Sequence, residues 1–581
     1  MLAGLGDKPQ FDVIVVGSGA GGMVAALRAH DLGLKVLVIE KSDRYGGTSA
    51  VSGAGLWIPN NPYIRDRDNA EKALDYLKKT TEGLAPEDML QRYVDYGPHI
   101  VEYLNEIGVE YYVNPDLHYP DYHPQVEGAL PHGRAMFVKP FDGAALGKEF
   151  FNLRESYPEF KLLDRITIDL DEGSAMIHQK RGWMLMLAKQ ILRYWLDIPW
   201  RLKTYRDRRL AHGNALVGGL RKAMIARDIP LSLKTSLLSL IHEDGRITGV
   251  VTDCDGQEIE LRASRGVILA AGGYEQSQEL RTRHLPPKSQ VSWSVTPRGN
   301  NTGDALQAVI AVDAKINEDL LGECWWAPSI AFPSKKSPNM TRNIGIFFER
   351  GFPHSLCVNR LGKRFVNEAC SYHLFGQAMI ADQKATGANS PCWMIFDSRY
   401  RRNYPLGALL PGRAMPDSML PPNWMDNVLY RADTLHALAE KIGIPAVELA
   451  RTTARFNESA RQGVDEDFGR GSNFYNAFLG DPKHKPNSCL GAIDKGPFYA
   501  CRLDLGDLGS KGGPVTDVNA QVIGNDGKPI DGLYAVGNCA STLMGRAYPG
   551  AGVTLGSTMI VGYLAASHLG QSNELGRRDA A

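Results

Sequence analysis

The clearest regular pattern of apolar and polar positions lies in the first forty residues. Residues 11–16 form a short, β-branched apolar run that is typical of a buried parallel strand, and residues 35–39 form a second one. The segment between them, residues 23–32, is expected to form a helix. This order predicts a strand, helix, strand unit at the start of a parallel sheet.

A glycine-rich turn joins the first strand to the helix. Gly17 permits the tight turn, Gly19 lets a pyrophosphate approach the backbone, and Gly22 lets the helix pack on the strand. Glu40 ends the second strand, 18 residues after Gly22, where an acid commonly binds ribose hydroxyls. Glycines alone are weak evidence, but strand, glycines, helix, strand and acid in this order favour a nucleotide site over a plain turn.

Three later segments decide which nucleotide is bound. Gly46-Gly-Thr-Ser-Ala50, residues 265–273 and residues 531–538 resemble the FAD-contacting motifs of the fumarate reductase and succinate dehydrogenase flavoprotein superfamily. Covalent members of that superfamily carry a histidine near Gly46, whereas this chain has Ser49 and Ala50, so the resemblance implies non-covalent FAD. The residues expected to contact FAD are Gly17, Ser18, Gly19, Gly22, Glu40, Lys41, Gly47, Thr48, Ser49, Ala271, Gly272, Gly537, Asn538 and Leu555.

The resemblance also implies the domain organisation and an α/β fold class. We expect a Rossmann-like FAD-binding domain with a doubly wound parallel sheet, built from residues 1–317 and 510–581. An α+β catalytic domain, residues 318–509, is expected to be inserted into it.

Composition restricts the functional class without choosing it. The chain has 581 residues and 43% hydrophobic content, enough for at least two cores. Lys plus Arg and Asp plus Glu both number 65, so no overall charge attracts nucleic acid. The eight cysteines form no C-x-x-C pair, which argues against iron–sulfur or zinc sites and for reduced thiols.

Two further features bear on where the protein is expected to act. Residues 1–9 lack a basic start followed by an apolar run, so no secretory signal is expected. No segment offers the roughly 20 uninterrupted apolar residues that a membrane-spanning helix needs. The cytoplasm is therefore the expected location.

The segment from residue 545 to residue 552 carries the first candidate chemistry. Tyr548 and Gly552 precede an apolar run that is expected to form a buried helix, so the Gly552 N–H is expected at the helix N-terminus, where negative charge is favoured. Together with the Tyr548 hydroxyl it would form an oxyanion pair. A phenol and glycines cannot balance two carboxylates, so a neutral carbonyl substrate is expected. Taken alone, Tyr548 is equally well interpreted as a packed core tyrosine.

Six segments in family order resemble the 3-ketosteroid Δ1-dehydrogenases along nearly the whole chain. They are residues 46–49, 365–376, 394–397, 496–500, 507–513 and 548–552. The resemblance implies that Tyr372 abstracts the C2 proton, that Tyr122 supports it, and that Tyr548 and Gly552 hold the C3 oxygen. It further implies C1 hydride transfer to flavin N5 and a 1,4-dien-3-one product. Family members often have tyrosine where this chain has His123 and proline where it has Ala551.

Aromatic residues near these motifs are candidates for an apolar steroid slot. Trp325, Trp326 and Phe375 are expected either to line this slot or to pack in an ordinary core, and the sequence does not choose between the two.

Residues 176–212 differ in character from the rest of the chain. Within them, residues 180–209 hold nine Lys or Arg against two Asp, interleaved with Trp183, Trp195 and Trp200. Such a segment suits a membrane interface, where sterols and a quinone acceptor dissolve, and would make the protein peripheral on the inner face of the cell membrane. Packing on the protein or on another subunit is an equally weighted alternative.

Other functions remain open from the sequence. A related flavoenzyme of different regiochemistry, acting at C4–C5, or an enoate or fumarate-type reductase would use the same tyrosines for another proton. An electron-transfer flavoprotein subunit is a candidate of another class, which the absence of iron–sulfur cysteine motifs makes weaker.

Overall fold

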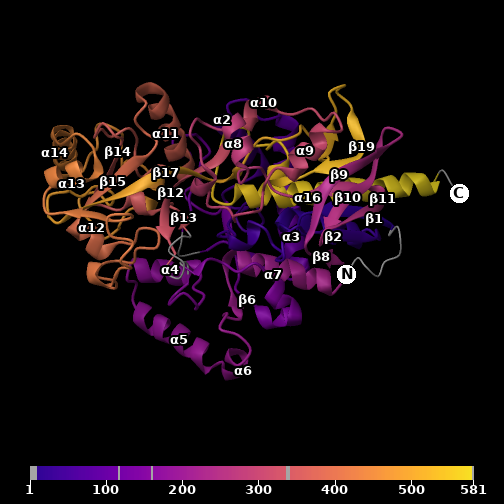
Figure 1. Ribbon diagram of the computed structural model, residues 1–581, viewed down its shortest axis with the longest axis horizontal. Coiled ribbons are helices and arrows are strands. Elements are labelled where there is room, and N and C mark those ends of the chain that lie inside the picture. The colour runs from indigo at the N-terminus through magenta and orange to yellow at the C-terminus, as the bar shows by residue number, and fades with distance from the viewer. Residues whose placement is uncertain (1–9, 115–117, 159–160, 335–340, 579–581) are drawn as a thin grey trace.

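The chain folds around two β-sheets that lie side by side along its longest dimension (Figure 1). In this computed structural model the described residues are 10–114, 118–158, 161–334 and 341–578. Residues 1–9, on which the expectation about a secretory signal rests, lie outside them.

The first sheet has the strand order β18-β19-β10-β11-β1-β2-β8, with β9 paired to β10. Its strands are β1 (Gln10–Val16), β2 (Val36–Ile39), β8 (Leu231–Ser232), β9 (Thr235–Glu243), β10 (Arg246–Cys254), β11 (Gln257–Leu269), β18 (Gln521–Ile523) and β19 (Pro529–Ala535). The run β8-β2-β1-β11-β19 is parallel, and β9, β10 and β18 add antiparallel pairs. The expected parallel nucleotide-binding sheet is present, with an antiparallel extension.

Strand β1 shows how this sheet is buried on both faces. Val13 and Val15 pack into the core that contains helix α1 (Ala20–Asp31), whereas Ile14 and Val16 pack into the core on the opposite face. Side chains alternate across a strand, so a continuous apolar run must find a core on each side. Helix α9 (Asp304–Ile310) contributes to that opposite core.

The C-terminal helix α16 (Val553–Arg578) returns to the N-terminal unit and packs against α1. A Cβ added at Gly21 would lie 2.8 Å from the Thr558 carbonyl oxygen, and one at Gly562 would lie 2.6 Å from the Gly21 carbonyl oxygen. The two helices therefore cross at glycine contacts, which brings the first and last segments of the chain to one place (Figure 1).

The second sheet is antiparallel and has the order β13-β12-β17-β15-β14, with β16 paired to β17. Its strands are β12 (Cys324–Pro333), β13 (Thr341–Gly345), β14 (Ser355–Val358), β15 (Cys392–Asp397), β16 (Tyr430–Ala432) and β17 (Phe498–Ser510). Helices α11 (Tyr372–Thr386), α12 (Ser398–Asn403), α13 (Leu435–Ile442), α14 (Ala446–Gln462) and α15 (Phe474–Leu479) surround it. All its strands come from between the N-terminal and C-terminal parts of the first sheet.

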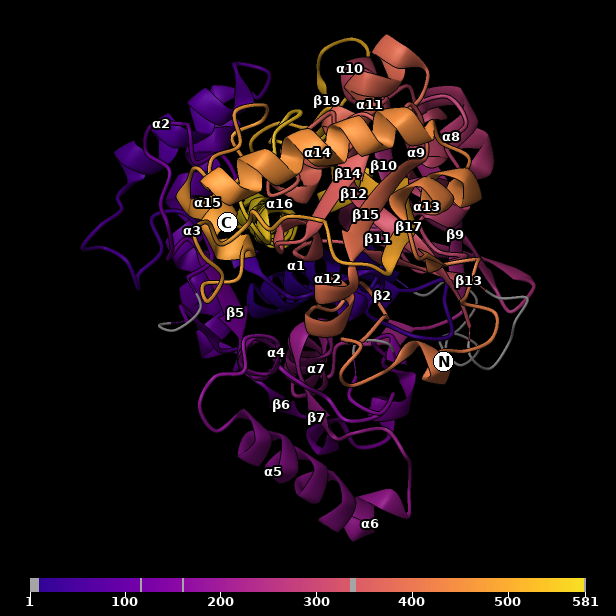
Figure 2. The ribbon, with the colours of Figure 1, turned by 90° about the vertical axis from the view of Figure 1, so that its left-hand side faces the viewer.

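The remaining elements connect or cover these two sheets. They are β3 (Leu56–Trp57), β4 (Tyr111–Tyr112), β5 (Ala135–Val138), β6 (Phe141–Asp142), β7 (Arg209–Leu210), α2 (Ala70–Thr81), α3 (Glu87–Glu106), α4 (Leu170–Ile177), α5 (Trp183–Leu196), α6 (Ile198–Arg201), α7 (His212–Ile225), α8 (Gln278–His284) and α10 (Glu318–Leu321). Helices α5 and α6 lie farthest from both sheets, at the bottom of the molecule (Figure 2). In the described part of the chain, no helix combines the length and hydropathy needed to cross a bilayer.

Candidate active site

A single cavity of about 1080 Å³ is lined both by the glycine-rich turn and by the candidate tyrosines. The turn after β1 supplies one end of the lining, and Tyr122, Tyr372 and Tyr548 supply another part of it. Residues that are hundreds of positions apart in the sequence therefore face one space, as a cofactor and its substrate require.

The nucleotide end of the cavity has the shape that a pyrophosphate needs. A Cβ at Gly17 would lie 2.3 Å from the Ala270 carbonyl oxygen, and one at Gly22 would lie 2.2 Å from the Gly17 carbonyl oxygen. Gly19 and Gly47, by contrast, line the cavity, and a Cβ there would meet only ordinary contacts, 3.6 Å from Ser49 Oγ and 3.9 Å from the Gly19 Cα, so a ligand can approach their backbone. Gly19 has no side chain to cap α1, and although the Ala20 N–H donates to Ser49 Oγ, the rest of this helix N-terminus can face an anion.

Polar contacts hold this end in place. Ser18 Oγ donates to Glu40 Oε2 over 2.6 Å, and the Gly46 N–H donates to Ser18 Oγ over 2.9 Å. Ser49 Oγ accepts from the Ala20 N–H over 3.0 Å. The segment around Gly46 is therefore tied to the first βα turn, as one binding site for both motifs requires.

Of the residues predicted to contact FAD, all except Gly537 line this cavity. Those in the lining are Gly17, Ser18, Gly19, Gly22, Glu40, Lys41, Gly47, Thr48, Ser49, Ala271, Gly272, Asn538 and Leu555. Gly537 has φ +69°, and a Cβ there would lie 2.0 Å from Thr558 Oγ1, so it shapes the turn that presents Asn538. The donor set and the open cradle fit FAD.

One polar residue of this end was missed in the sequence. Asn301 lines the cavity and donates from Nδ2 to Thr48 Oγ1 over 3.0 Å and to Glu275 Oε1 over 2.6 Å. It lies in a loop without a recognisable motif, and only its place beside the Gly46 segment marks it.

Three tyrosine rings meet at the other end of the cavity. Tyr372 Oη donates to Tyr548 Oη over 2.8 Å. The Tyr122 ring packs edge-to-face on Tyr372, with centroids 5.4 Å apart, and stacks on Tyr548 at 5.3 Å. The predicted base, its supporting phenol and the predicted oxyanion donor are thus in mutual contact.

The oxygen of Tyr548 faces the start of helix α16. The Gly552 N–H and the Thr554 hydroxyl both hydrogen-bond to it and lower the pKa of the phenol, although burial is the larger effect and raises that pKa. Gly552 directly precedes α16 and has φ +100°, and a Cβ there would lie 2.1 Å from the Gly55 carbonyl oxygen. Gly552 must therefore be glycine for its N–H to reach this place. The sequence pattern did not indicate Thr554.

The main chain around Tyr122 is fixed to the loop that carries Tyr548. The Tyr122 N–H donates to the Pro549 carbonyl oxygen over 2.9 Å. Asp121 accepts from Trp57 Nε1 and from Arg134 Nη1, each over 2.8 Å, and both its carboxylate and Arg134 are buried. This buried network positions Tyr122 independently of the residue that follows it, so His123 does not disturb the arrangement.

Burial dominates the titration of the tyrosine pair. It raises the pKa of Tyr372 well above the ordinary value, while a hydrogen bond from Tyr122 acts in the opposite direction. Tyr372 is thus kept protonated by its environment, and the hydrogen bond from Tyr122 favours the phenolate that Tyr372 needs in order to act as a base.

The tryptophan and phenylalanine residues proposed for the substrate slot are placed differently. The Trp325 ring packs edge-to-face on Tyr548, with centroids 5.1 Å apart, but Trp325 is not part of the cavity lining. Trp326 and Phe375 are buried in the core of the second sheet and do not line the cavity either. Of the two alternatives in the sequence, the structure shows core packing for these two residues.

A different set of aromatic residues lines the cavity beside the tyrosines. Phe347 packs on the Tyr372 ring with centroids 5.0 Å apart, and Tyr119 packs on Phe137 at 5.1 Å and on Phe478 at 4.7 Å. These residues, with Phe348, lie in the lining. They come from four loops and elements without a motif, so no local signal could have indicated them.

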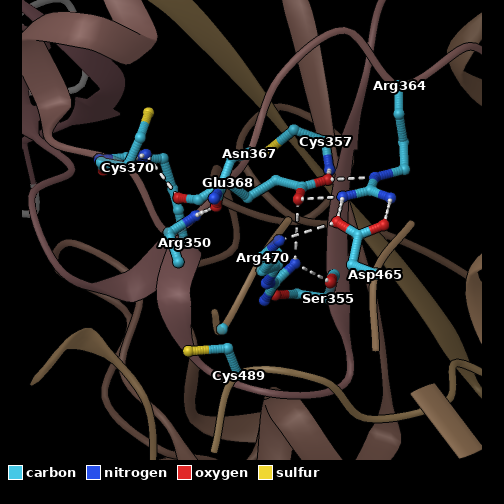
Figure 3. A network of polar contacts seen from close by, with 12 residues as sticks. Arg350, Ser355, Cys357, Arg364, Asn367, Glu368, Cys370, Asp465, Arg470 and Cys489 are labelled. Carbon is cyan, nitrogen blue, oxygen red and sulfur yellow. Dashed lines mark hydrogen bonds and ion pairs between the residues drawn. The ribbon is translucent and has the colours of Figure 1, made fainter. Parts of the chain in front are cut away.

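A buried network of charges anchors the loop that leads to Tyr372 (Figure 3). Glu368 accepts from Arg364 over 2.7 and 2.8 Å and pairs with Arg470 at 3.3 Å. Arg350 donates to the carbonyl oxygens of Glu368, over 2.7 Å, and Cys370, over 3.4 Å. Burial raises the pKa of Glu368, but the two guanidinium groups outweigh it and hold the pKa below its ordinary value.

Replacing Glu368 with glutamine should destabilise the protein by roughly 3 kcal/mol, because it leaves a buried guanidinium without its carboxylate. The measurement is the free energy of unfolding in denaturant. The difference in free energy of unfolding between the wild type and this variant should be fully present above about pH 4.3, the ordinary carboxyl pKa. It should be lost as the pH falls through the lowered pKa of Glu368 in the folded state. The exposed pair of Glu279 with Arg283 provides the control, since Glu279→Gln should change little. Equal stability of the two variants would contradict the prediction.

Comparisons with known proteins agree with this geometry. A family model described as an FAD binding domain matches residues 12–555. The 3-oxosteroid 1-dehydrogenase of Mycobacterium tuberculosis is 37% identical, over 98% of this chain and 99% of that protein. The 4-oxocyclohex-2-ene-1-carboxylate 5-dehydrogenase of Sinomonas cyclohexanicum is 35% identical, over 97% and 95%.

Among solved structures, the chain resembles the 3-ketosteroid Δ1-dehydrogenase of Sterolibacterium denitrificans in complex with 1,4-androstadiene-3,17-dione. The TM-score is 0.92 with 45% identity, and the match covers 97% of this chain and 100% of the other. The match therefore extends over nearly the whole chain. The chain therefore belongs to the FAD-dependent 3-ketosteroid Δ1-dehydrogenase family.

Proposed function

We propose that this protein desaturates 3-oxo-4-ene steroids between C1 and C2, giving 1,4-dien-3-ones. The observation that carries the proposal is the 2.8 Å contact between the hydroxyls of Tyr372 and Tyr548 at the wall of the same cavity as the glycine cradle. A carbonyl oxygen and its α-carbon are two bonds apart, so a base and an oxyanion donor for one ketone must lie this close together.

Each residue has a separate task in this proposal. Tyr548 Oη and the Gly552 N–H hold the C3 oxygen and stabilise the negative charge that develops on it. Tyr372 takes the C2 proton, and the Tyr122 hydroxyl stabilises the Tyr372 phenolate. Bound FAD supplies the acceptor for the hydride that leaves C1. The steroid thus loses one proton and one hydride, and the C1–C2 bond becomes double.

The aromatic lining supports a neutral, flat substrate. Tyr119, Phe137, Phe347, Phe348 and Phe478 offer apolar ring surface next to the tyrosines, as a steroid nucleus requires.

Anaerobic mixing of the holoenzyme with androst-4-ene-3,17-dione tests the proposal. We expect bleaching of the flavin absorbance and formation of androsta-1,4-diene-3,17-dione. 4-Oxocyclohexanecarboxylate serves as the comparison substrate, because it shares the ketone but lacks the steroid nucleus. Faster bleaching by the small keto acid would overturn the steroid assignment while leaving the tyrosine chemistry intact.

We also propose that α5 and α6 dock the enzyme on a lipid bilayer, where a quinone could serve as the electron acceptor. Two polar side chains of helix α5 bind the rest of the protein: Gln190 Nε2 donates to Glu172 over 2.6 Å and Arg193 binds Asp207 over 2.6 Å. Its outer face is apolar instead, with Leu185 77% and Leu196 70% exposed. An outward apolar face at the tip of the molecule is unfavourable in water unless something covers it (Figure 2).

The neighbouring residues favour lipid as the covering surface. Trp195 and Leu202 extend the apolar face, and Lys189 and Lys203 are exposed beside it. Exposed lysines next to tryptophan and leucine suit an anionic bilayer surface.

Vesicle sedimentation tests this docking. The triple substitution Leu192→Ser, Trp195→Ser and Leu196→Ser should weaken partition onto phosphatidylglycerol-containing vesicles by roughly tenfold or more, because three exposed apolar groups no longer enter the bilayer. The control replaces Leu238, Met419 and Val447, which are exposed elsewhere, with serine. A wild type that does not sediment with vesicles, or that forms a dimer abolished by the triple substitution, would contradict the proposal.

A further inference from the structure

Lys511 is a fully buried cation beside the tyrosine site, and neither the sequence motifs nor the proposed mechanism gives it a task. It directly follows β17, and its ammonium group donates to the carbonyl oxygens of Gly545, Arg546 and Ala547 over 3.3, 2.8 and 2.9 Å. Within the described residues the only other polar contact of the ammonium group is a 3.5 Å approach to His373 Nε2. Its charge is thus compensated by backbone carbonyl dipoles, and no carboxylate is in direct contact with it. Burying a charge in this way costs free energy in a protein interior.

The three carbonyl groups belong to the turn that leads directly into Tyr548. His373, the residue after Tyr372, donates from Nε2 to the same Arg546 carbonyl oxygen over 2.9 Å. Its Nδ1 accepts from the Trp326 N–H over 3.2 Å, which makes Nε2 the protonated nitrogen of a neutral ring. The turn is therefore held both by Lys511 and by the helix that begins with Tyr372.

The ammonium group of Lys511 is also connected to the Tyr548 ring through Trp325. Its Nζ is 4.2 Å from the centre of the Trp325 ring, whose edge-to-face contact with Tyr548 has a centroid distance of 5.1 Å. Trp325 in turn donates from Nε1 to Asn538 Oδ1 over 3.0 Å, which connects this arrangement to the cofactor turn.

The titratable neighbours of Lys511 do not supply a second buried charge. Burial keeps His373 neutral and lowers the pKa of His123 to about 4. Glu323 and Arg546 form an ion pair at 3.5 Å nearer the surface, and the Cys324 thiol is held neutral by burial. Burial lowers the pKa of Lys511 to about 7, and Glu323 acts in the opposite direction, so the positive charge is present below about pH 7 and is lost as the pH rises above it.

We propose that Lys511 is a positioning residue of the oxyanion site: it fixes the turn that carries Tyr548 and places a positive charge near that phenol, where it favours negative charge on the substrate oxygen. This inference rests on the proposed function, since it concerns the same carbonyl oxygen.

The test measures negative charge on a bound oxygen without turnover. Equilenin carries an acidic naphthol at the position of the steroid 3-oxo group, and its absorbance distinguishes the neutral from the ionised form. Lys511→Gln keeps a hydrogen-bond donor but removes the charge, and Lys511→Met removes both. We expect both variants of the holoenzyme to raise the pKa of bound equilenin by about one unit, a tenfold loss of the ionised form. Lys511→Arg should restore most of it.

Turnover and folding controls complete the design. Lys441→Gln, a substitution in helix α13 remote from these residues, should leave equilenin ionisation unchanged. The steady-state kcat of Lys511→Gln should fall by about tenfold with little change in KM, since the charge acts on the enolate and not on the bound ketone. Equal equilenin ionisation in Lys511→Gln and the wild type would overturn the inference. A wild type that ionises equilenin but does not desaturate the steroid would instead overturn the proposed function.

Discussion

Replacing Tyr372 with phenylalanine is expected to slow flavin bleaching by androst-4-ene-3,17-dione by roughly 10³-fold, the size of a lost general base. The substitution removes one oxygen atom and keeps the ring, so its contacts with Phe347 and Tyr122 remain. Steroid binding should therefore change little. Anaerobic stopped-flow absorbance gives the rate, and its dependence on steroid concentration gives the dissociation constant.

Tyr475 provides a matched control for this experiment. It is a buried tyrosine whose ring packs on Tyr122 with centroids 5.2 Å apart, yet it does not line the cavity. Tyr475→Phe should bleach within a few-fold of the wild-type rate. A Tyr372→Phe enzyme that bleaches at the wild-type rate, or that only loses affinity for the steroid, would reassign Tyr372 from base to pocket wall.

The second large effect is expected from Tyr548→Phe, which removes a donor to the carbonyl oxygen. Loss of one oxyanion donor lowers kcat by roughly 10²- to 10³-fold, because the hydrogen bond strengthens as negative charge develops on the substrate. The Gly552 N–H remains, so some stabilisation of the enolate should survive. The measurement is kcat together with the pKa of bound equilenin, which should rise in parallel with the loss of rate.

Thr554→Val tests whether the loss of rate belongs to the Tyr548 hydroxyl or to its neighbour Thr554. The Thr554 hydroxyl hydrogen-bonds to the Tyr548 oxygen, and valine keeps the shape of the side chain. Its effect on kcat should be clearly smaller than that of Tyr548→Phe, since the phenol itself stays in place. If Thr554→Val were as damaging, the threonine hydroxyl and not the phenol would be the donor to the substrate.

The nucleotide cradle was predictable because its parts are neighbours in sequence. A strand, a glycine turn and a helix within about twenty residues fix one local geometry, and the structure shows Gly17, Gly19 and Gly22 in the expected arrangement. Glu40 directly follows β2, the parallel strand next to β1, so the pairing of β1 with β2 sets its position.

The tyrosine site could be predicted only through family resemblance. Tyr122 and Tyr548 are 426 residues apart, as 548 minus 122 shows, and no periodicity connects them. Their contact depends on the pairing of Asp121 with Gly550 and on the ion pair of Asp121 with Arg134. These are tertiary interactions, and the same residues in another fold would not bring the two phenols together.

The adjacent tryptophans show why the substrate slot was harder to assign. Trp325 and Trp326 follow each other on β12, so their side chains point to opposite faces of the sheet. Trp325 packs with Tyr548, and Trp326 enters the core of the second sheet. Sequence adjacency suggested one environment for both, although the strand geometry gives them two.

The sequence by itself determined the cofactor class and the α/β frame, because those features depend on local motifs, and by resemblance it predicted the tyrosines that are proposed to react. Only the tertiary structure decided which aromatic rings line the slot, that α5 turns its apolar face outward, and that Lys511 binds the turn before Tyr548. These features depend on which surfaces of distant segments meet, and that choice is made by burial and hydrogen bonding across the whole chain.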